Sequence, residues 1–307
     1  MQSTTVRRTA LAAAVVAALS GVAACGAQDD GKDGKGGKGG NAAQEVAPVS
    51  PIAALRSADR STDQAESVKV RSTMSLGKLM ETSADGALAW NGGGLRGEMT
   101  LTYTGGDMAE LMRKAGSASA QARYLPDAYY AKMSGAFVKQ YGGRHWLRYG
   151  YADIAKLGGR GATAYLQDQV RHSSPNQTVK LLLASGDVKK AGEEKVDGVA
   201  TTHYSGAVDI AALAGRDSGL TAAQLSELKS ELTQAGITTE TVDIWMNDKN
   251  LLVKKVEKAK SANGEMVSTT HFSDYGVKVT TEAPPAGDTK DFKDLMKSLP
   301  SGSGLPS

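Results

Sequence analysis

Runs of alternating apolar and polar residues recur along this chain, and they constrain its fold more than any other feature. In residues 68–76, Val, Ser, Met and Leu alternate with Lys, Arg, Thr and Ser, and this period of two marks a half-buried strand. Most runs are separated by short turn signals such as Asp197-Gly198 and Asn263-Gly264, which favour antiparallel hairpins over crossover connections. The other alternating or β-rich runs cover residues 88–90, 98–103, 122–124, 129–133, 146–149, 199–204, 239–246, 251–259, 265–272 and 277–281.

Helix signals stand between some of these runs. Residues 53–67 have a helical pattern, and residues 174–177 (Ser-Pro-Asn-Gln) offer an N-cap, a proline at the first helical position and a capping-box partner. Gly186 ends the helix that they open. A second capping box at residues 221–224 opens a helix that Gly236 ends. Strands in series with a few helices predict an α+β fold, in which an antiparallel sheet carries helices on one face.

The N-terminus has the layout of an exported protein. Two arginines precede an Ala/Val/Leu run over residues 11–19, which is too short to span a bilayer permanently and is typical of a secretory signal. The following Val22-Ala23-Ala24-Cys25 resembles the bacterial lipobox, in which the cysteine receives diacylglycerol and the leader is cleaved just before it. Cys25 is also the only cysteine of the chain. We therefore expect residues 1–24 to be a signal peptide and Cys25 to be the lipid attachment site; an ordinary signal peptide with an incidental cysteine is the alternative.

The segment after Cys25 is a predicted tether. It is rich in Gly, Lys and Asp and then in Ala and Pro, so residues 25–51 should form a flexible linker that spans roughly 25–30 Å as a random coil. We place a single folded domain at residues 52–290, because no repeat or second linker divides it, and a C-terminal tail at residues 291–307. No second long apolar run follows the leader, so we expect a body tethered to the outer face of the cytoplasmic membrane.

Charge and motifs argue against several functions. The chain has 36 Lys+Arg and 33 Asp+Glu, and loss of Arg7 and Arg8 with the leader leaves 34 against 33, so nothing favours nucleic-acid binding. Residues 92–97 fit the dinucleotide fingerprint G-x-G-x-x-G, but a strand pattern follows where a helix is required. The four histidines are far apart, without metal-ligand spacing. We expect no enzyme activity, cofactor or metal; a hydrolase would need a convergent His/Ser/Asp cluster.

Methionine is the more informative residue type. The chain has ten methionines and only three phenylalanines. Methionine side chains are flexible and polarizable, and they suit a cavity that accepts variable acyl chains. Ordinary filling of gaps in a hydrophobic core is the alternative.

Residues 192–204 carry a family resemblance. They are similar to the G-x-x-x-V-x-G-x-x-T-x-H-Y hairpin of the LppX/LprAFG family of actinobacterial lipoproteins, which are related to the LolA/LolB lipoprotein carriers. The similarity extends over about residues 68–285, although residues 105–119 do not align and Asn247-Asp248 departs from the usual acidic position. The other matching segments are residues 129–133, 146–147, 175–183, 242–245, 272–276 and 283–284.

The resemblance implies a strongly curved antiparallel sheet, a half-barrel, with helices that cover its concave face over an apolar cavity. Members of this family hold lipids or acylated glycolipids there and move them at the cell envelope. The alternative is a non-enzymatic envelope lipoprotein that docks a protein or signalling partner, with a filled concave face. The residues we expect to line the cavity are Val70, Met74, Met99, Leu101, Trp146, Leu182 and Trp245.

Overall fold

The computed structural model describes residues 50–90, 94–133, 142–153, 175–209 and 236–298, with a few isolated positions between them. The helices of this part are α1 Pro51–Ala65, α2 Gly106–Lys114, α6 Asn176–Ser185 and α8 Phe292–Ser298, with a short 3-10 turn at Ala286–Asp288. The strands are β1 Ser67–Leu76, β2 Met80–Ala89, β3 Arg96–Gly105, β4 Ser119–Tyr124, β5 Ala128–Lys132, β6 Trp146–Gly150, β7 Val188–Val196, β8 Val199–Asp209, β9 Thr239–Met246, β10 Leu252–Ser261, β11 Gly264–Ser273 and β12 Thr289–Asp291.

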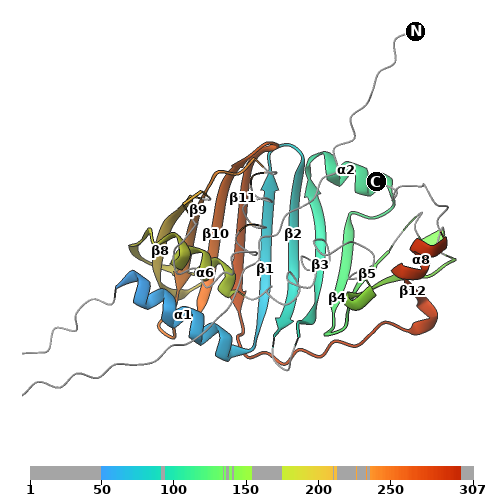
Figure 1. The fold of residues 1–307 in the computed structure, drawn as a ribbon, viewed down its shortest axis with the longest axis horizontal. Coiled ribbons are helices and arrows are strands. Elements are labelled where there is room, and N and C mark those ends of the chain that lie inside the picture. The colour runs from blue at the N-terminus through green and yellow to red at the C-terminus, as the bar shows by residue number, and fades with distance from the viewer. Residues whose placement is uncertain are drawn as a thin grey trace, which may run out of the picture.

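All twelve of these strands belong to one open sheet. Their order is β12-β6-β5-β4-β3-β2-β1-β11-β10-β9-β8-β7. Every pair of neighbours is antiparallel except β12 and β6, which are parallel. The sheet curves strongly, and α1 and α6 lie across one face of its β7–β11 half (Figure 1). The predicted fold class, a curved antiparallel sheet with helices on its concave face, is confirmed.

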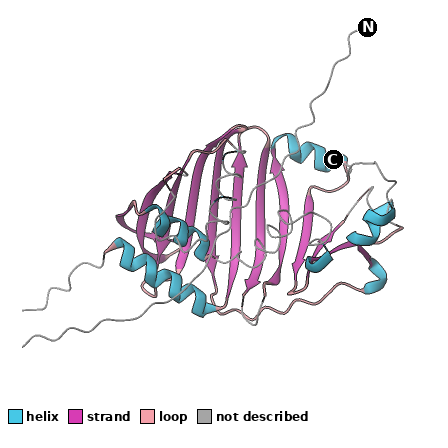
Figure 2. Ribbon diagram, viewed as in Figure 1, coloured by secondary structure: helices cyan, strands magenta, loops and turns pink. Residues whose placement is uncertain are grey.

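The two faces of the sheet differ in what covers them. Successive strand residues point to opposite faces, and we call the face that contacts α1 and α6 the inner face and the other the outer face. Leu55 of α1 and Leu182 of α6 are fully buried against inner-face residues, among them Val68 of β1 and Ile244 of β9. Figure 2 shows that α2 and α8 lie at the other half of the sheet, near its margins.

Local signals explain where the two packed helices begin and end. Ser50 caps α1, because its Oγ accepts a hydrogen bond from the Ala53 N–H at 3.2 Å. Gly186 ends α6 in the left-handed conformation, with a φ of 65°, as predicted. The start of α6 differs from the prediction, since Pro175 is the N-cap residue and makes no side-chain cap bond.

Several other elements differ from the sequence prediction. The strand expected at residues 277–281 is absent, because β11, the strand before it, already pairs with β1 on one side and β10 on the other and has no free side for a hairpin partner. Strand β7 and helix α2 were not predicted. Helix α8 extends the packed body past residue 290, where we expected a tail. The helix predicted over residues 221–236 lies almost entirely outside the described residues.

Candidate functional site

The inner face of strands β1–β6 and β11 has no charged side chain. In these strands Lys69 and Arg71 of β1, Asp85 of β2 and Glu98 of β3 all point to the outer face, and their other Lys, Arg, His, Asp and Glu residues do the same. The inner face instead carries aliphatic residues, methionines, tyrosines and a few hydroxyl side chains. This segregation makes one side of the half-sheet an uncharged and mostly apolar surface.

Cross-strand register arranges that surface in rows. One row runs from β11 to β6 and contains no polar side chain; its members are Phe272, Val70, Gly86, Met99, Ala122, Ala131 and Leu147. The next row includes Ala84, Leu101 and Ala120, and it continues through the hydroxyl residues Ser72 of β1 and Thr270 of β11. Most of these side chains are only half-buried, in contrast to the closed core beneath α1 and α6. We call the residues of these two rows the apolar strip.

Gly86 shapes the middle of the apolar strip. A Cβ atom at this position would meet the Met99 Sδ at 2.6 Å and would also clash with the Glu98 backbone carbonyl. The glycine therefore leaves the space in which the Met99 side chain lies flat on the sheet. Sequence reasoning singled out Met99 but did not identify its glycine neighbour.

The structure brings four of the seven predicted cavity residues together. Val70, Met99 and Leu101 belong to the apolar strip, and Met74 lies on the same face of β1, next to it. Leu182 also faces the inner side, but it comes from α6 and is fully buried in the closed core.

The two predicted tryptophans lie on the outer face. Trp245 stacks on His203 with 4.2 Å between ring centroids, and its Nε1 donates to Glu194 Oε1 at 2.6 Å. Trp146 packs with Tyr130 and has the Arg123 guanidinium 4.8 Å from its ring centroid. They are therefore not brought together with the other five residues. The outward orientation of Trp245 could have been read from the sequence. Trp245 has the opposite strand phase to Val242 and Ile244, so it points to the opposite face of the sheet.

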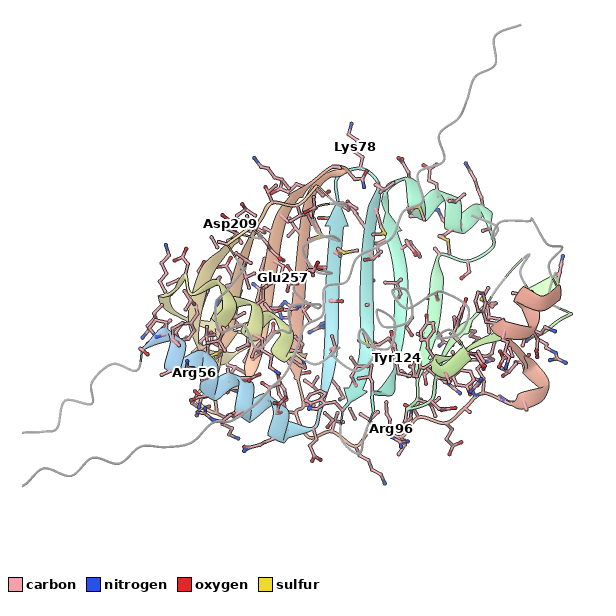
Figure 3. All side chains as sticks on the ribbon, in the orientation of Figure 1. Arg56, Lys78, Arg96, Tyr124, Asp209 and Glu257 are labelled. Atoms are coloured by element: carbon pink, nitrogen blue, oxygen red, sulfur yellow. The ribbon has the colours of Figure 1, made fainter. Side chains whose placement is uncertain are left out.

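A group of tyrosines borders the apolar strip on β4–β6. Tyr124 and Tyr129 have ring centroids 5.4 Å apart, and Tyr129 and Tyr149 have centroids 5.6 Å apart. Tyr151 packs against the same group, together with Leu88. We call these four residues the tyrosine cluster; Tyr124, labelled in Figure 3, marks its place. No pattern in the sequence marks this cluster.

A cluster of polar side chains lies on the inner face in the β7–β11 half of the sheet, beneath α6. Thr178 of α6 donates to Glu257 of β10 at 2.7 Å and accepts from Lys255 at 3.0 Å, while Lys255 and Glu257 pair at 2.9 Å. Glu240 of β9 lies beside them with an exposed fraction of 5%. Burial, first of all, and the nearby negative charge of Glu257 raise the pKa of Glu240, while Lys255 lowers it, and the net result is a pKa of about 8.

Nothing in the described residues assembles a catalytic or metal centre. His145, His203 and His271 each contact a single aspartate, at 2.7 to 2.8 Å, and they do so at three separate places. His172 lies outside the described residues. Within the described part, no group of three or more His, Cys, Asp or Glu could hold a metal ion, and no helix is both long and apolar enough to cross a membrane.

Solved structures with a similar fold include two mycobacterial lipoproteins. LprF from Mycobacterium bovis is 18% identical, with 76% of this chain and 96% of LprF covered at a TM-score of 0.45. LppX from Mycobacterium tuberculosis is 16% identical, with 75% of this chain and 97% of LppX covered at a TM-score of 0.44. Both names belong to the lipoprotein group that the sequence resembles. These TM-scores are too low to transfer any residue or ligand.

Sequence relatives give the stronger comparison. No protein-family model matches the chain. A Streptomyces coelicolor protein with the description "Putative lipoprotein" is 44% identical over 310 residues, which cover 97% of this chain and 99% of the relative. An uncharacterized 31.2 kDa protein of Streptomyces griseus is 48% identical over 246 residues, which cover 80% of each chain. The chain therefore belongs to the family of these two Streptomyces proteins.

Proposed function

We propose that this protein is an exported, membrane-anchored lipoprotein that holds the acyl chains of a lipid against the inner face of its sheet and carries the lipid at the cell envelope. The observation that carries the proposal is the apolar strip. Its first row crosses seven strands without a polar side chain, and the strip is largely half-buried.

The physical basis is the hydrophobic effect. Each methylene group moved from water onto an apolar surface gains about 0.8 kcal/mol. No charged side chain of β1–β6 or β11 would lose its hydration when an acyl chain covers the inner face. Carriage of a lipid needs only such a surface and a way in, so no catalytic group is required.

The proposed anchor is the lipidated Cys25, which lies outside the described residues. The "Putative lipoprotein" description of the Streptomyces coelicolor relative supports it. A linker of about 25 residues would keep the body within roughly 25–30 Å of the bilayer. The carrier would thus remain close to the membrane from which it draws lipid.

A lipid-uptake experiment tests the proposal. Delipidated protein is incubated with vesicles of phosphatidylethanolamine and phosphatidylglycerol that also contain dioleoylglycerol, and bound lipid is measured by native mass spectrometry. We expect about one lipid per chain for the wild type and at least a tenfold lower occupancy for Leu101→Glu, because the carboxylate must lose its hydration under an acyl chain.

The matched control for that experiment is Thr100→Glu. Thr100 is the neighbour of Leu101 in β3 and points to the outer face, and both side chains are half-buried. We expect this variant to take up lipid like the wild type. Wild-type protein that acquires no lipid would reject the proposal and would favour the alternative, a lipoprotein that docks a protein partner.

A further inference from the structure

The tyrosine cluster is a candidate site that acyl-chain binding alone does not explain. Its rings continue the inner face beyond the apolar strip, since Tyr124 pairs with Tyr129 and Tyr129 with Tyr149 in adjacent strands. Tyr151 lies against the same rings and against Leu88. A lipid that lies along the apolar strip would therefore reach this cluster with one of its ends.

The hydroxyl of Tyr151 is the most informative atom of the cluster. The residue has an exposed fraction of 8%, and its Oη has no hydrogen-bond partner in the described part of the chain. Native proteins pair nearly all of their buried polar groups, because an unpaired one has lost its hydration without compensation. An unpaired hydroxyl that is buried beside the apolar strip thus indicates a missing partner.

The cluster offers uncharged hydrogen-bond donors. Burial raises the pKa of Tyr124, Tyr129 and Tyr151, so all three hydroxyls keep their protons at neutral pH. The acidic group that acts on Tyr151 is Asp127, whose carboxylate accepts a hydrogen bond from Arg148 at 3.1 Å. The inner face of β1–β6 holds no cation that could neutralise a phosphate or carboxylate.

We propose that the tyrosine cluster binds the uncharged, ester-bearing end of the lipid, with the Tyr151 hydroxyl donating a hydrogen bond to an ester carbonyl or hydroxyl oxygen. This inference rests on the proposed function. It assigns the ligand to the class of uncharged acylglycerols and excludes lipids whose anionic head would have to lie at this position, because that head would be buried without a counter-charge.

Three lipid probes test the inference with full-length protein purified in detergent and then delipidated. The probes are dioleoylglycerol, dioleoyl phosphatidic acid and hexadecane, and bound amounts are measured by native mass spectrometry. We expect dioleoylglycerol to be retained at least tenfold better than phosphatidic acid. We expect Tyr151→Phe to lower the retention of dioleoylglycerol about threefold to tenfold, the range for one lost hydrogen bond, and to leave that of hexadecane unchanged.

The chain supplies a matched pair of control variants. Tyr129 and Tyr130 are adjacent in β5, but Tyr129 faces the cluster and Tyr130 faces outward against Trp146. We expect Tyr129→Phe to weaken retention of dioleoylglycerol and Tyr130→Phe to have no effect on it. Tyr151→Phe should melt no lower than the wild type, since it removes a hydroxyl without a partner in the described residues.

The results separate this inference from the function on which it rests. One outcome is that hexadecane and dioleoylglycerol both bind but Tyr151→Phe retains dioleoylglycerol like the wild type. In that case the tyrosine cluster does not bind the ester-bearing end of the lipid, while the proposed lipid-carrier function is retained. Equal retention of phosphatidic acid and dioleoylglycerol also overturns the assignment. If none of the three probes binds, both proposals fail.

Discussion

At the scale of single residues, Glu240 is a carboxyl group buried in the sheet's closed half. It occupies an inner-face position of β9, in phase with Val242 and Ile244, and an apolar residue would be expected there. Its burial and the neighbouring Glu257 favour the protonated carboxyl. A proton held in the folded state and lost in the unfolded state couples stability to pH.

The sign of that coupling follows from the two pKa values. The unfolded carboxyl titrates near 4.5 and the folded one at about 8, so the folded protein binds one extra proton between these values. Stability should therefore fall as the pH rises from about 4.5 to 8, by up to about 1.4 kcal/mol per pH unit from this group, and should change no further above that range. We expect Glu240→Gln to flatten this dependence in urea unfolding at pH 5 and pH 8.

The control for this prediction is Glu265→Gln. Glu265 lies on the outer face of β11 and is exposed, so its replacement should leave the pH dependence of unfolding as it is in the wild type. If Glu240→Gln behaves like this control, the Glu240 carboxyl is not held protonated in the folded protein.

At the scale of elements, the packing of α6 on β8 holds the closed half of the sheet together. Gly206 of β8 allows the close approach, because a Cβ there would meet the Leu182 Cδ2 at 2.8 Å. Leu182 is fully buried, whereas Leu111 of α2 has an exposed fraction of 57%. These two helical leucines should therefore differ widely in their contribution to stability.

We expect Leu182→Ala to lower the free energy of unfolding by about 2–5 kcal/mol, because it leaves a cavity in the closed core. Leu111→Ala should change it by less than about 0.5 kcal/mol, as is usual for exposed positions. Urea denaturation followed by circular dichroism measures both values. Similar losses for the two variants would mean that α6 does not close the core.

A strand could be predicted from the sequence where one of its faces is buried and the other is exposed, because its residues then alternate between apolar and polar. Strand β9 was predicted with its observed bounds, because Val242, Ile244 and Met246 recur at every second position and belong to the core beneath α6. Strand β7 was missed since it is an edge strand of mostly Lys, Glu and Gly, held by pairing with β8. Residues 277–281 alternate as a strand would, but alternation cannot show whether a sheet edge is free to pair.

At the scale of the whole molecule, the pattern within one strand also limits how much of the candidate site can be predicted, because it does not show which strands are neighbours. The inner-face position of Val70, Met99 and Leu101 could be predicted, because each lies in the apolar phase of its own strand. The tyrosine cluster could not, since its members come from β4, β5, β6 and the residue after β6, and only the sheet order brings them together. Trp146 and Trp245 were expected to line the cavity because of their residue type alone, and they lie on the outer face instead.

The whole molecule, as proposed, is a body on a lipid tether, and Cys25 is the residue that should hold it at the membrane. Cys25→Ser removes the only thiol that could be acylated, so the protein should move from the membrane fraction of the cells to the medium. Cys25 precedes the linker and the described body, so the variant should melt and take up dioleoylglycerol like the wild type. Fractionation with antibody detection gives the first result, and Ser20→Ala, within the leader, is the control that should stay anchored. A Cys25→Ser protein that remains in the membrane fraction would show that another segment anchors the chain.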